Sequence, residues 1–113
     1  QYPHYPGTGS NSERGIGKGG GYTLNIPMRS GSGDADYVSA FNKNVIPALD
    51  AFKPEIILIS AGFDAHEFDQ LSSINLTTET YYKFTKMLSG GGFPCLYSIG
   101  SIFKMAKMNF TPV

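Results

Sequence analysis

Residues 55–66 read EIILISAGFDAH, and this stretch decides the fold. It begins with a continuous apolar run instead of an alternating one, which is typical of a parallel strand that is covered on both faces. Ligand sites in parallel sheets gather beyond the carboxyl ends of the strands. Asp64 lies just past the apolar run, so it is the first candidate for a functional residue.

The residues before this run predict a strand and a helix. Residues 22–27 alternate in polarity, which predicts a short strand that ends at Pro27. Residues 34–52 carry apolar side chains at three- to four-residue spacing, the pattern of one buried helical face. We expect Asp34 to cap this helix and Pro47 to kink or shorten it. Strand, helix and buried strand would form a βαβ unit with a right-handed crossover.

The residues after the run predict one more helix. Residues 77–88 place Tyr81 and Phe84 on an apolar face that would pack on the sheet, with Thr77 or Thr78 as the cap. Three glycines then break the pattern, and residues 93–113 give no assignable element. The fold class predicted from these elements is α/β: a fragment of an open, mostly parallel sheet flanked by helices.

The bulk properties exclude several classes of protein. A length of 113 residues allows one core. Nine basic against nine acidic residues give no sign of a polyanion-binding surface, so nucleic acid is not an expected partner. The single cysteine, Cys95, cannot form an internal disulfide, and we expect it to be a small buried residue in a reducing compartment. No apolar run is long enough to span a membrane.

The start of the chain sets a further expectation. It lacks the features of a signal peptide, which together with the single cysteine predicts a cytoplasmic protein, or a nuclear one in a eukaryote. The first residue is Gln1 instead of methionine, so we expect the natural N-terminus to lie upstream.

Asp64 has two readings. A carboxylate beyond a buried strand is costly unless it is paired or binds a metal ion, but aspartate also commonly caps turns. The sequence gives even less support for a metal site made of Asp64 and His66 together. A catalytic zinc needs three protein ligands, and the remaining candidates, His4 and Cys95, have no recognisable spacing.

The glycine cluster at residues 15–21 could in principle cradle a phosphate group. Phosphate-binding loops follow a strand and open a helix, whereas this cluster precedes the predicted strand and lacks the Gly-Lys-Ser/Thr ending. We therefore interpret it as a flexible crossing that uses positive φ angles.

Several motifs in fixed order resemble the histone deacetylase superfamily, in particular its class II-like and bacterial members and the acetylpolyamine amidohydrolases. They are the YPGTG of residues 5–9, the glycine cluster running into YTLNIP at 22–27, the GD of 33–34 with Tyr37, SAGFDAH at 60–66 and LT at 76–77. The resemblance covers residues 1–88. It implies an arginase/deacetylase-like fold.

The resemblance also implies roles for single residues. Asp64 would be one ligand of a zinc ion that an Asp-x-His pair also holds. Tyr5 and Leu71 match positions that line the tunnel for the acyl-lysine substrate and its rim. Tyr22 matches a position associated with a structural potassium ion.

The chain departs from the family pattern at several positions of the catalytic site. It contains no His-His pair and no upstream Asp-x-His, so the proton shuttle and two metal ligands are absent. Downstream, Gly91-Gly92 precedes Phe93 where the family closes its site with a tyrosine. This segment comes too soon after the predicted helix to hold the expected strand, and Tyr97 is a weak substitute for the catalytic tyrosine. Gln70 stands where proline is usual.

The sequence therefore predicts a partial catalytic domain, with residues 89–113 divergent or truncated. The expected function is that of a fragment of a zinc-dependent deacetylase, inactive alone, which needs the remainder of its domain to act on acetyl-lysine or acetylpolyamine amides. The alternative is a catalytically dead α/β module for interaction or regulation. Upstream sequence with His-His and Asp-x-His would favour the enzyme, and a genuine start near Gln1 would favour the alternative.

Overall fold

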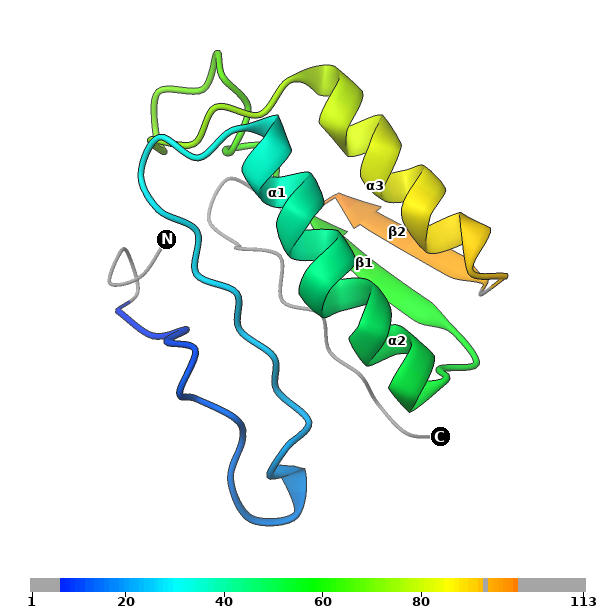
Figure 1. The fold of residues 1–113 in the computed structure, drawn as a ribbon. Helices are drawn as coiled ribbons and strands as arrows, with labels where there is room; N and C mark the ends of the chain where they lie inside the picture. Colours follow the sequence, from blue (N-terminus) through cyan, green and yellow to red (C-terminus); the bar gives the residue numbers. More distant parts are fainter. Residues whose placement is uncertain (1–6, 93, 100–113) are drawn as a thin grey trace.

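A computed structural model describes residues 7–92 and 94–99, with only the backbone of residues 95–99. Two parallel strands lie beneath two rows of helix (Figure 1). The elements in chain order are η1 Gly17–Gly19, α1 Asp34–Ala40, η2 Phe41–Val45, α2 Ile46–Phe52, β1 Ile57–Ala61, α3 Thr78–Gly90 and β2 Cys95–Ile99.

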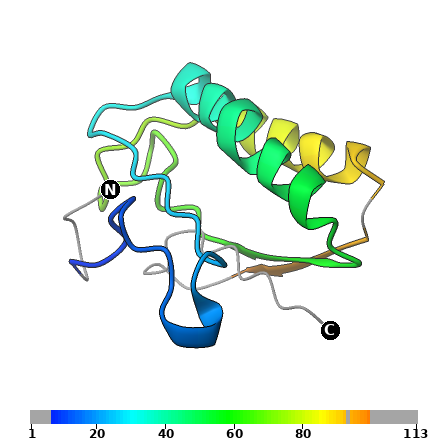
Figure 2. The same cartoon turned by 60° about the horizontal axis from the view of Figure 1, so that its bottom comes forward.

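The two strands form a parallel sheet. β1 and β2 pair from Ile57 opposite Cys95 to Ala61 opposite Ile99. Their connection runs through α3, so the βαβ unit of the described chain is β1–α3–β2. After turning the molecule, both rows of helix are seen to cover the same face of the sheet (Figure 2). The predicted α/β class and the parallel pairing are confirmed.

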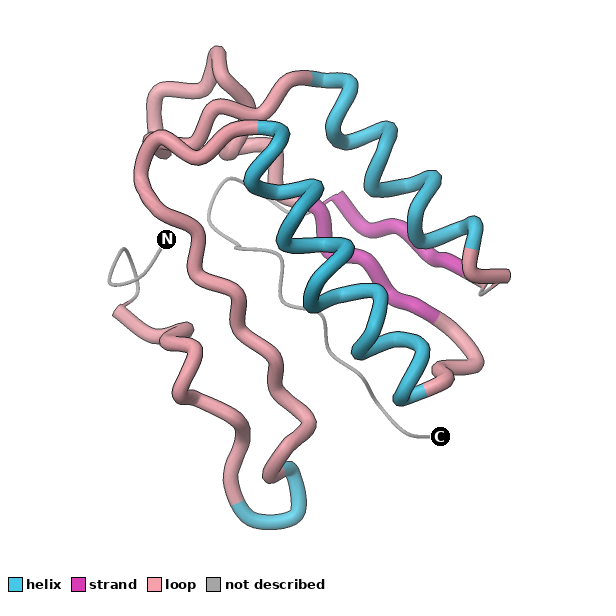
Figure 3. Tube along the Cα trace, viewed as in Figure 1, coloured by secondary structure: helices cyan, strands magenta, loops and turns pink. Residues whose placement is uncertain are grey.

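The helix predicted over residues 34–52 forms as one path of three segments, α1, η2 and α2 (Figure 3). Its N-cap is Gly33, whose N–H donates to the Asp36 carboxylate, so Asp34 is the first helical residue. Pro47 does not end the helix. The path widens into a π-helical turn over η2, immediately before the first turn of α2 in which Pro47 lies. Proline lacks the N–H that an interior helical residue donates, and single π turns are a known irregularity inside α-helices.

A small apolar core joins these helices to the sheet. Its buried members are Val45, Leu49, Ile57 and Leu88, which come from η2, α2, β1 and α3. Each such side chain contributes about 1.5–3 kcal/mol by leaving water. The helices are also held by a stack of Phe41 on Phe84, with ring centroids 4.1 Å apart and planes inclined by 7°.

Two expectations about strands were wrong. Residues 22–27 form no strand in the described chain, because no neighbouring segment pairs with them; Ile26 packs against the core from a loop instead. Conversely, β2 follows α3 directly, where no strand was expected. Gly92 adopts a φ of 77° after α3, which lets the chain reverse within a few residues and start the strand at Cys95.

The other face of β1 carries apolar side chains that the described residues leave exposed. Leu58 is 51% exposed, and Ile56, just before the strand, is 42% exposed. The apolar run predicted a strand covered on both faces. Within the described part of the chain, helices cover only one.

Candidate functional site

Asp64 lies in the loop that leaves the carboxyl end of β1, beyond the last strand residue Ala61. Its side chain is half-buried. Among the described residues, no hydrogen bond reaches its carboxylate oxygens; only its main-chain carbonyl is bonded, to Ser72. A partly buried carboxylate in this condition is available to bind a cation or a donor from elsewhere.

The loop that carries Asp64 is closed by its own hydrogen bonds. The Ser72 hydroxyl donates to the Asp64 carbonyl at 2.6 Å. The Leu76 N–H donates to the Ala65 carbonyl at 3.0 Å, and the Glu67 N–H donates to the Leu76 carbonyl at 2.9 Å. These bonds hold the main chain around Asp64 in one conformation, although most of the segment has no regular secondary structure.

The same loop is anchored to the segment that precedes α1. The Asn75 N–H donates to the Ser32 carbonyl at 2.9 Å, and the Gly31 N–H donates to the Ser73 carbonyl at 2.6 Å. The loop's own Ile74 and Leu76 are buried. Asp64 therefore sits on a rigid support, as a metal ligand or a positioned charge requires.

Asp34 joins the starts of α1 and α3 beside this loop. Its carboxylate accepts the Thr77 N–H at 2.9 Å and the Thr77 hydroxyl at 2.7 Å. The Thr77 N–H bond, followed by its hydroxyl, holds the pKa of Asp34 below its usual value. Thr77 is the N-cap of α3, as predicted, but its side chain bonds to Asp34 instead of capping the helix.

His66 is not arranged as a metal ligand. The Phe68 N–H donates to His66 Nδ1 at 3.3 Å, so Nδ1 is unprotonated and Nε2 carries the hydrogen. Nε2 lies 3.0 Å from the Thr78 hydroxyl oxygen, which can accept it. Both ring nitrogens are thus occupied. No cluster of three His, Cys, Asp or Glu side chains suited to a metal ion occurs among the described residues, so Asp64 fits one position of a metal site and not a complete one.

Two phenols lie within the electrostatic reach of Asp64. Burial, followed by the negative charge of Asp64, raises the pKa of Tyr37 to about 12 and that of Tyr81 likewise to about 12. Both hydroxyls are therefore protonated at neutral pH. The apolar spacing of residues 77–88 predicts a core-facing position for Tyr81 but not its proximity to Asp64. The available signal was a phenolic O–H on an apolar face, which needs a partner when buried.

The other predicted site residues do not gather around Asp64 in the described chain. Leu71 is 52% exposed in the same loop, where its N–H donates to Asp69 Oδ1 at 2.8 Å. Tyr22 is exposed, and the edge of one ring meets Phe52 at the end of α2, with ring centroids 6.2 Å apart. Their roles as tunnel rim and potassium position remain predictions.

Two predicted residues fall wholly or partly outside the described structure. Tyr5 lies outside the described residues. Tyr97 has only its backbone described, in β2 opposite Ile59. The tunnel role of Tyr5 and the catalytic role of Tyr97 therefore also remain predictions.

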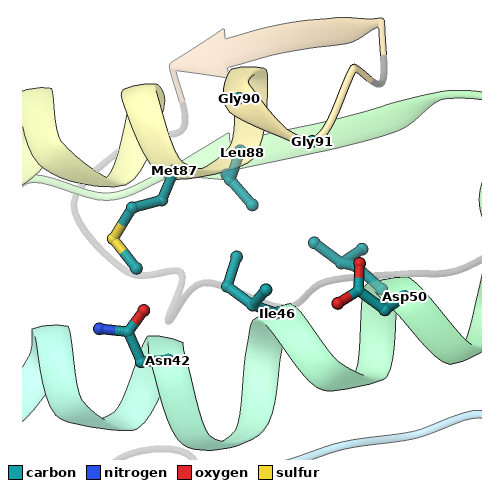
Figure 4. Close-up of a pocket in the computed structure, with 8 residues that line it drawn as sticks. Asn42, Ile46, Asp50, Met87, Leu88, Gly90 and Gly91 are labelled. Atoms are coloured by element: carbon teal, nitrogen blue, oxygen red, sulfur yellow. The ribbon is translucent and has the colours of Figure 1, made fainter.

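A cleft of about 310 Å³ opens between the helix rows, away from this site (Figure 4). Asn42, Ile46 and Asp50 face Met87 and Leu88 across it. It is lined by residues of η2, α2 and the carboxyl end of α3, whereas Asp64 follows the carboxyl end of β1. The cleft is therefore not part of the candidate site.

No helix in the described portion of the chain has the length and apolar character needed to cross a membrane.

The chain is similar in sequence to several known deacetylases. The chain is 50% identical over 82 residues to histone deacetylase 14, chloroplastic, of Arabidopsis thaliana, covering 73% of this chain and 19% of that protein. It is 47% identical over 81 residues to a probable deacetylase of Archaeoglobus fulgidus, covering 72% of this chain and 23% of the relative. The chain thus spans about a fifth of the length of these relatives.

Solved structures give the same result. The HDA15 HD domain matches with a TM-score of 0.76 and 41% identity, over 85% of this chain and 28% of that structure. Acetylpolyamine aminohydrolase from Burkholderia pseudomallei matches with a TM-score of 0.76 and 30% identity, over 82% and 27%. The sequence profile described as the histone deacetylase domain matches residues 1–95. The protein is therefore a member of the histone deacetylase family.

Proposed function

We propose that this chain forms part of the catalytic domain of a zinc-dependent deacetylase and that Asp64 is its contribution to the metal site. The substrates would be acetyl-lysine or acetylpolyamine amides. Relatives named histone deacetylase and acetylpolyamine aminohydrolase support this substrate range. Cytoplasmic localisation, expected from the sequence, is part of the proposal; two relatives are named as chloroplastic.

One observation carries the proposal. Asp64 presents a half-buried carboxylate, with no hydrogen bond from the described residues, beyond the end of a parallel strand. An aspartate that merely capped the turn would accept main-chain N–H groups of the following residues with its side chain. Asp69 does so toward Leu71, whereas Asp64 does not.

The chain's own residues hold this carboxylate in place. Ser72 fixes the Asp64 carbonyl, and the contacts of Asn75 with Ser32 fix the loop against the start of α1. A bound zinc ion would polarise the acetyl carbonyl and lower the pKa of water. Carboxylate oxygen is an established zinc ligand, so the donor that Asp64 offers suits this metal.

The remaining components would come from outside these residues. One carboxylate cannot supply the three protein ligands of a catalytic zinc, and the chain contains no His-His pair for proton transfer. The exposed Leu58 on the uncovered face of β1 is also consistent with further chain packing there. The 113 residues alone are accordingly not expected to hydrolyse amides. The proposed potassium site at Tyr22 and the tunnel residues Tyr5 and Leu71 belong to the same complete domain.

The test compares two aspartates in the complete catalytic domain. Asp64→Asn keeps the shape of the side chain and removes its charge, so hydrolysis of both an acetyl-lysine peptide and an acetylpolyamine should be nearly abolished. Asp50→Asn makes the same chemical change on the exposed end of α2 and should leave turnover unchanged. Equal activity of the two variants would show that Asp64 has no part in the chemistry.

A further inference from the structure

Tyr81 has a buried hydroxyl whose partner is missing. Its oxygen is enclosed and makes no hydrogen bond within the described part of the chain. Buried phenols normally find a partner, and a native exception calls for an explanation. The partner must be a group that the ring position of Tyr81 brings within reach.

The ring of Tyr81 is held over the loop that carries Asp64. Tyr81 lies in the first turns of α3, and its ring centroid is 5.2 Å from that of Phe63. It is also 6.3 Å from the ring of His66, with the planes inclined by 18°. Phe63 and His66 flank Asp64 closely on both sides in the sequence. Tyr81 therefore packs on the two side chains that bracket the proposed metal ligand.

Asp64 is a suitable acceptor for the Tyr81 hydroxyl, because the ring of Tyr81 packs on Phe63 and His66, the side chains on either side of Asp64. After burial, the Asp64 charge is the largest cause that raises the pKa of Tyr81, ahead of Tyr37 and Asp69. Asp69 already accepts the Leu71 N–H with Oδ1. A phenolic O–H is a hydrogen-bond donor, and the Asp64 carboxylate has no donor among the described residues.

His66 cannot serve as the partner. Its Nδ1 accepts the Phe68 N–H, and its Nε2 lies 3.0 Å from the Thr78 hydroxyl. The His66 ring thus packs against the Tyr81 ring but offers no acceptor to its phenolic O–H.

We propose that the Tyr81 hydroxyl donates a hydrogen bond to the Asp64 carboxylate in the complete domain and thereby orients it for metal binding. Tyr81 is a positioning residue: it acts through Asp64 and does not touch the substrate. This inference rests on the proposed function of Asp64. Groups that bond to metal ligands from behind fix their orientation, and their loss commonly costs about 10- to 100-fold in metal affinity or activity.

Tyr81→Phe in the complete domain removes only the hydroxyl and keeps the ring contacts with Phe63 and His66. Tyr82→Phe is the matched control, because Tyr82 is the next residue of α3 and is 57% exposed. Zinc affinity is measured by competition with a chelator, and the visible absorption of the cobalt-substituted protein reports the ligand geometry. Thermal unfolding shows that each variant is folded.

We expect Tyr81→Phe to weaken zinc binding by at least about tenfold and to alter the cobalt spectrum, while Tyr82→Phe matches the wild type. A folded Tyr81→Phe protein with wild-type zinc affinity and cobalt spectrum would overturn the inference, since a purely structural phenol would change neither.

Asp64→Asn separates this inference from the proposed function. If Asp64→Asn loses zinc but Tyr81→Phe does not, the positioning role of Tyr81 is wrong and the function of Asp64 stands. If Asp64→Asn keeps zinc, the proposed function itself is wrong and the inference falls with it. If both variants bind zinc more weakly, the double variant with Asp64→Asn and Tyr81→Phe should have the same zinc affinity as Asp64→Asn alone. The reason is that the Tyr81 hydroxyl acts only through the Asp64 carboxylate.

Discussion

The hydroxyl of Thr77 donates a hydrogen bond of 2.7 Å to Asp34 Oδ2, joining residues 43 positions apart. Asp34 opens α1 and Thr77 caps α3, so this bond ties together the starts of the two helices that frame the Asp64 loop. The position of Asp64 thus depends on a contact remote from it in the sequence.

Asp34→Ala in the complete domain should lower the free energy of unfolding by about 1–2 kcal/mol, because it removes two hydrogen bonds to a charged acceptor. Chemical denaturation measures this change. Asp50→Ala, on the exposed end of α2, should have little effect. Equal stability of the two variants would mean that the Asp34–Thr77 contact does not hold the helices.

The same contact has a pH signature. The folded pKa of Asp34 lies below its unfolded value, so its contribution is present above about pH 4 and is lost as pH falls through the folded pKa. The stability difference between wild type and Asp34→Ala should therefore shrink on acidification. A difference that grows at low pH would contradict the account.

Leu49→Ala should destabilise the protein by about 2–5 kcal/mol, since Leu49 is only 2% exposed at the centre of the core between α2, α3 and β1. The measurement is again the free energy of unfolding. Ile16→Ala is the control; Ile16 is 92% exposed, so this change should stay within about 0.5 kcal/mol. A similar loss in both variants would contradict the core described here.

The buried phenols predict sensitivity to alkali. The pKa values of Tyr37 and Tyr81, both about 12, lie above the value near 10 of an unfolded tyrosine. The folded state keeps these protons longer, so the stabilisation is complete below about pH 10 and is lost between about pH 10 and 12. Wild type and Tyr81→Phe should be compared by titration of the tyrosinate absorbance. The variant should lack a group that titrates near pH 12 in the wild type. If it lacks a group that titrates near pH 10 instead, Tyr81 is not perturbed.

Leu71→Ala should raise the KM for acetyl-lysine peptides in the complete domain and leave bound zinc unchanged, if Leu71 forms part of the tunnel rim. Its side chain is half-exposed and lies in the loop that carries Asp64, while its N–H is held by Asp69. Steady-state kinetics with parallel metal analysis separates the two effects. An unchanged KM would show that Leu71 does not form part of the tunnel rim.

The sequence predicted the elements whose patterns are local. The apolar spacing of residues 34–52 and the unbroken run of 56–59 gave the helix path and β1 with nearly correct bounds. Residues 22–27 failed because a strand needs a partner, and local alternation cannot supply one. The strand β2 was missed because its start depends on the turn at Gly92.

The site was predictable only in part. The place of Asp64 beyond a buried strand followed from the sequence, and its proposed metal role came from the family resemblance. The approach of Tyr81 did not follow, because it requires α3 to fold back over the loop through the Thr77–Asp34 bond. Long-range contacts of this kind leave no periodic signal in the sequence.

The zinc content of the complete domain shows whether Asp64 is a metal ligand. Purified wild-type protein and Asp64→Ala should be compared by mass spectrometry of bound metal, with thermal unfolding as a check on folding. We expect one equivalent of zinc in the wild type and a large loss in the variant, since a charged ligand is removed. A folded Asp64→Ala protein that retains the wild-type equivalent of zinc would contradict this expectation.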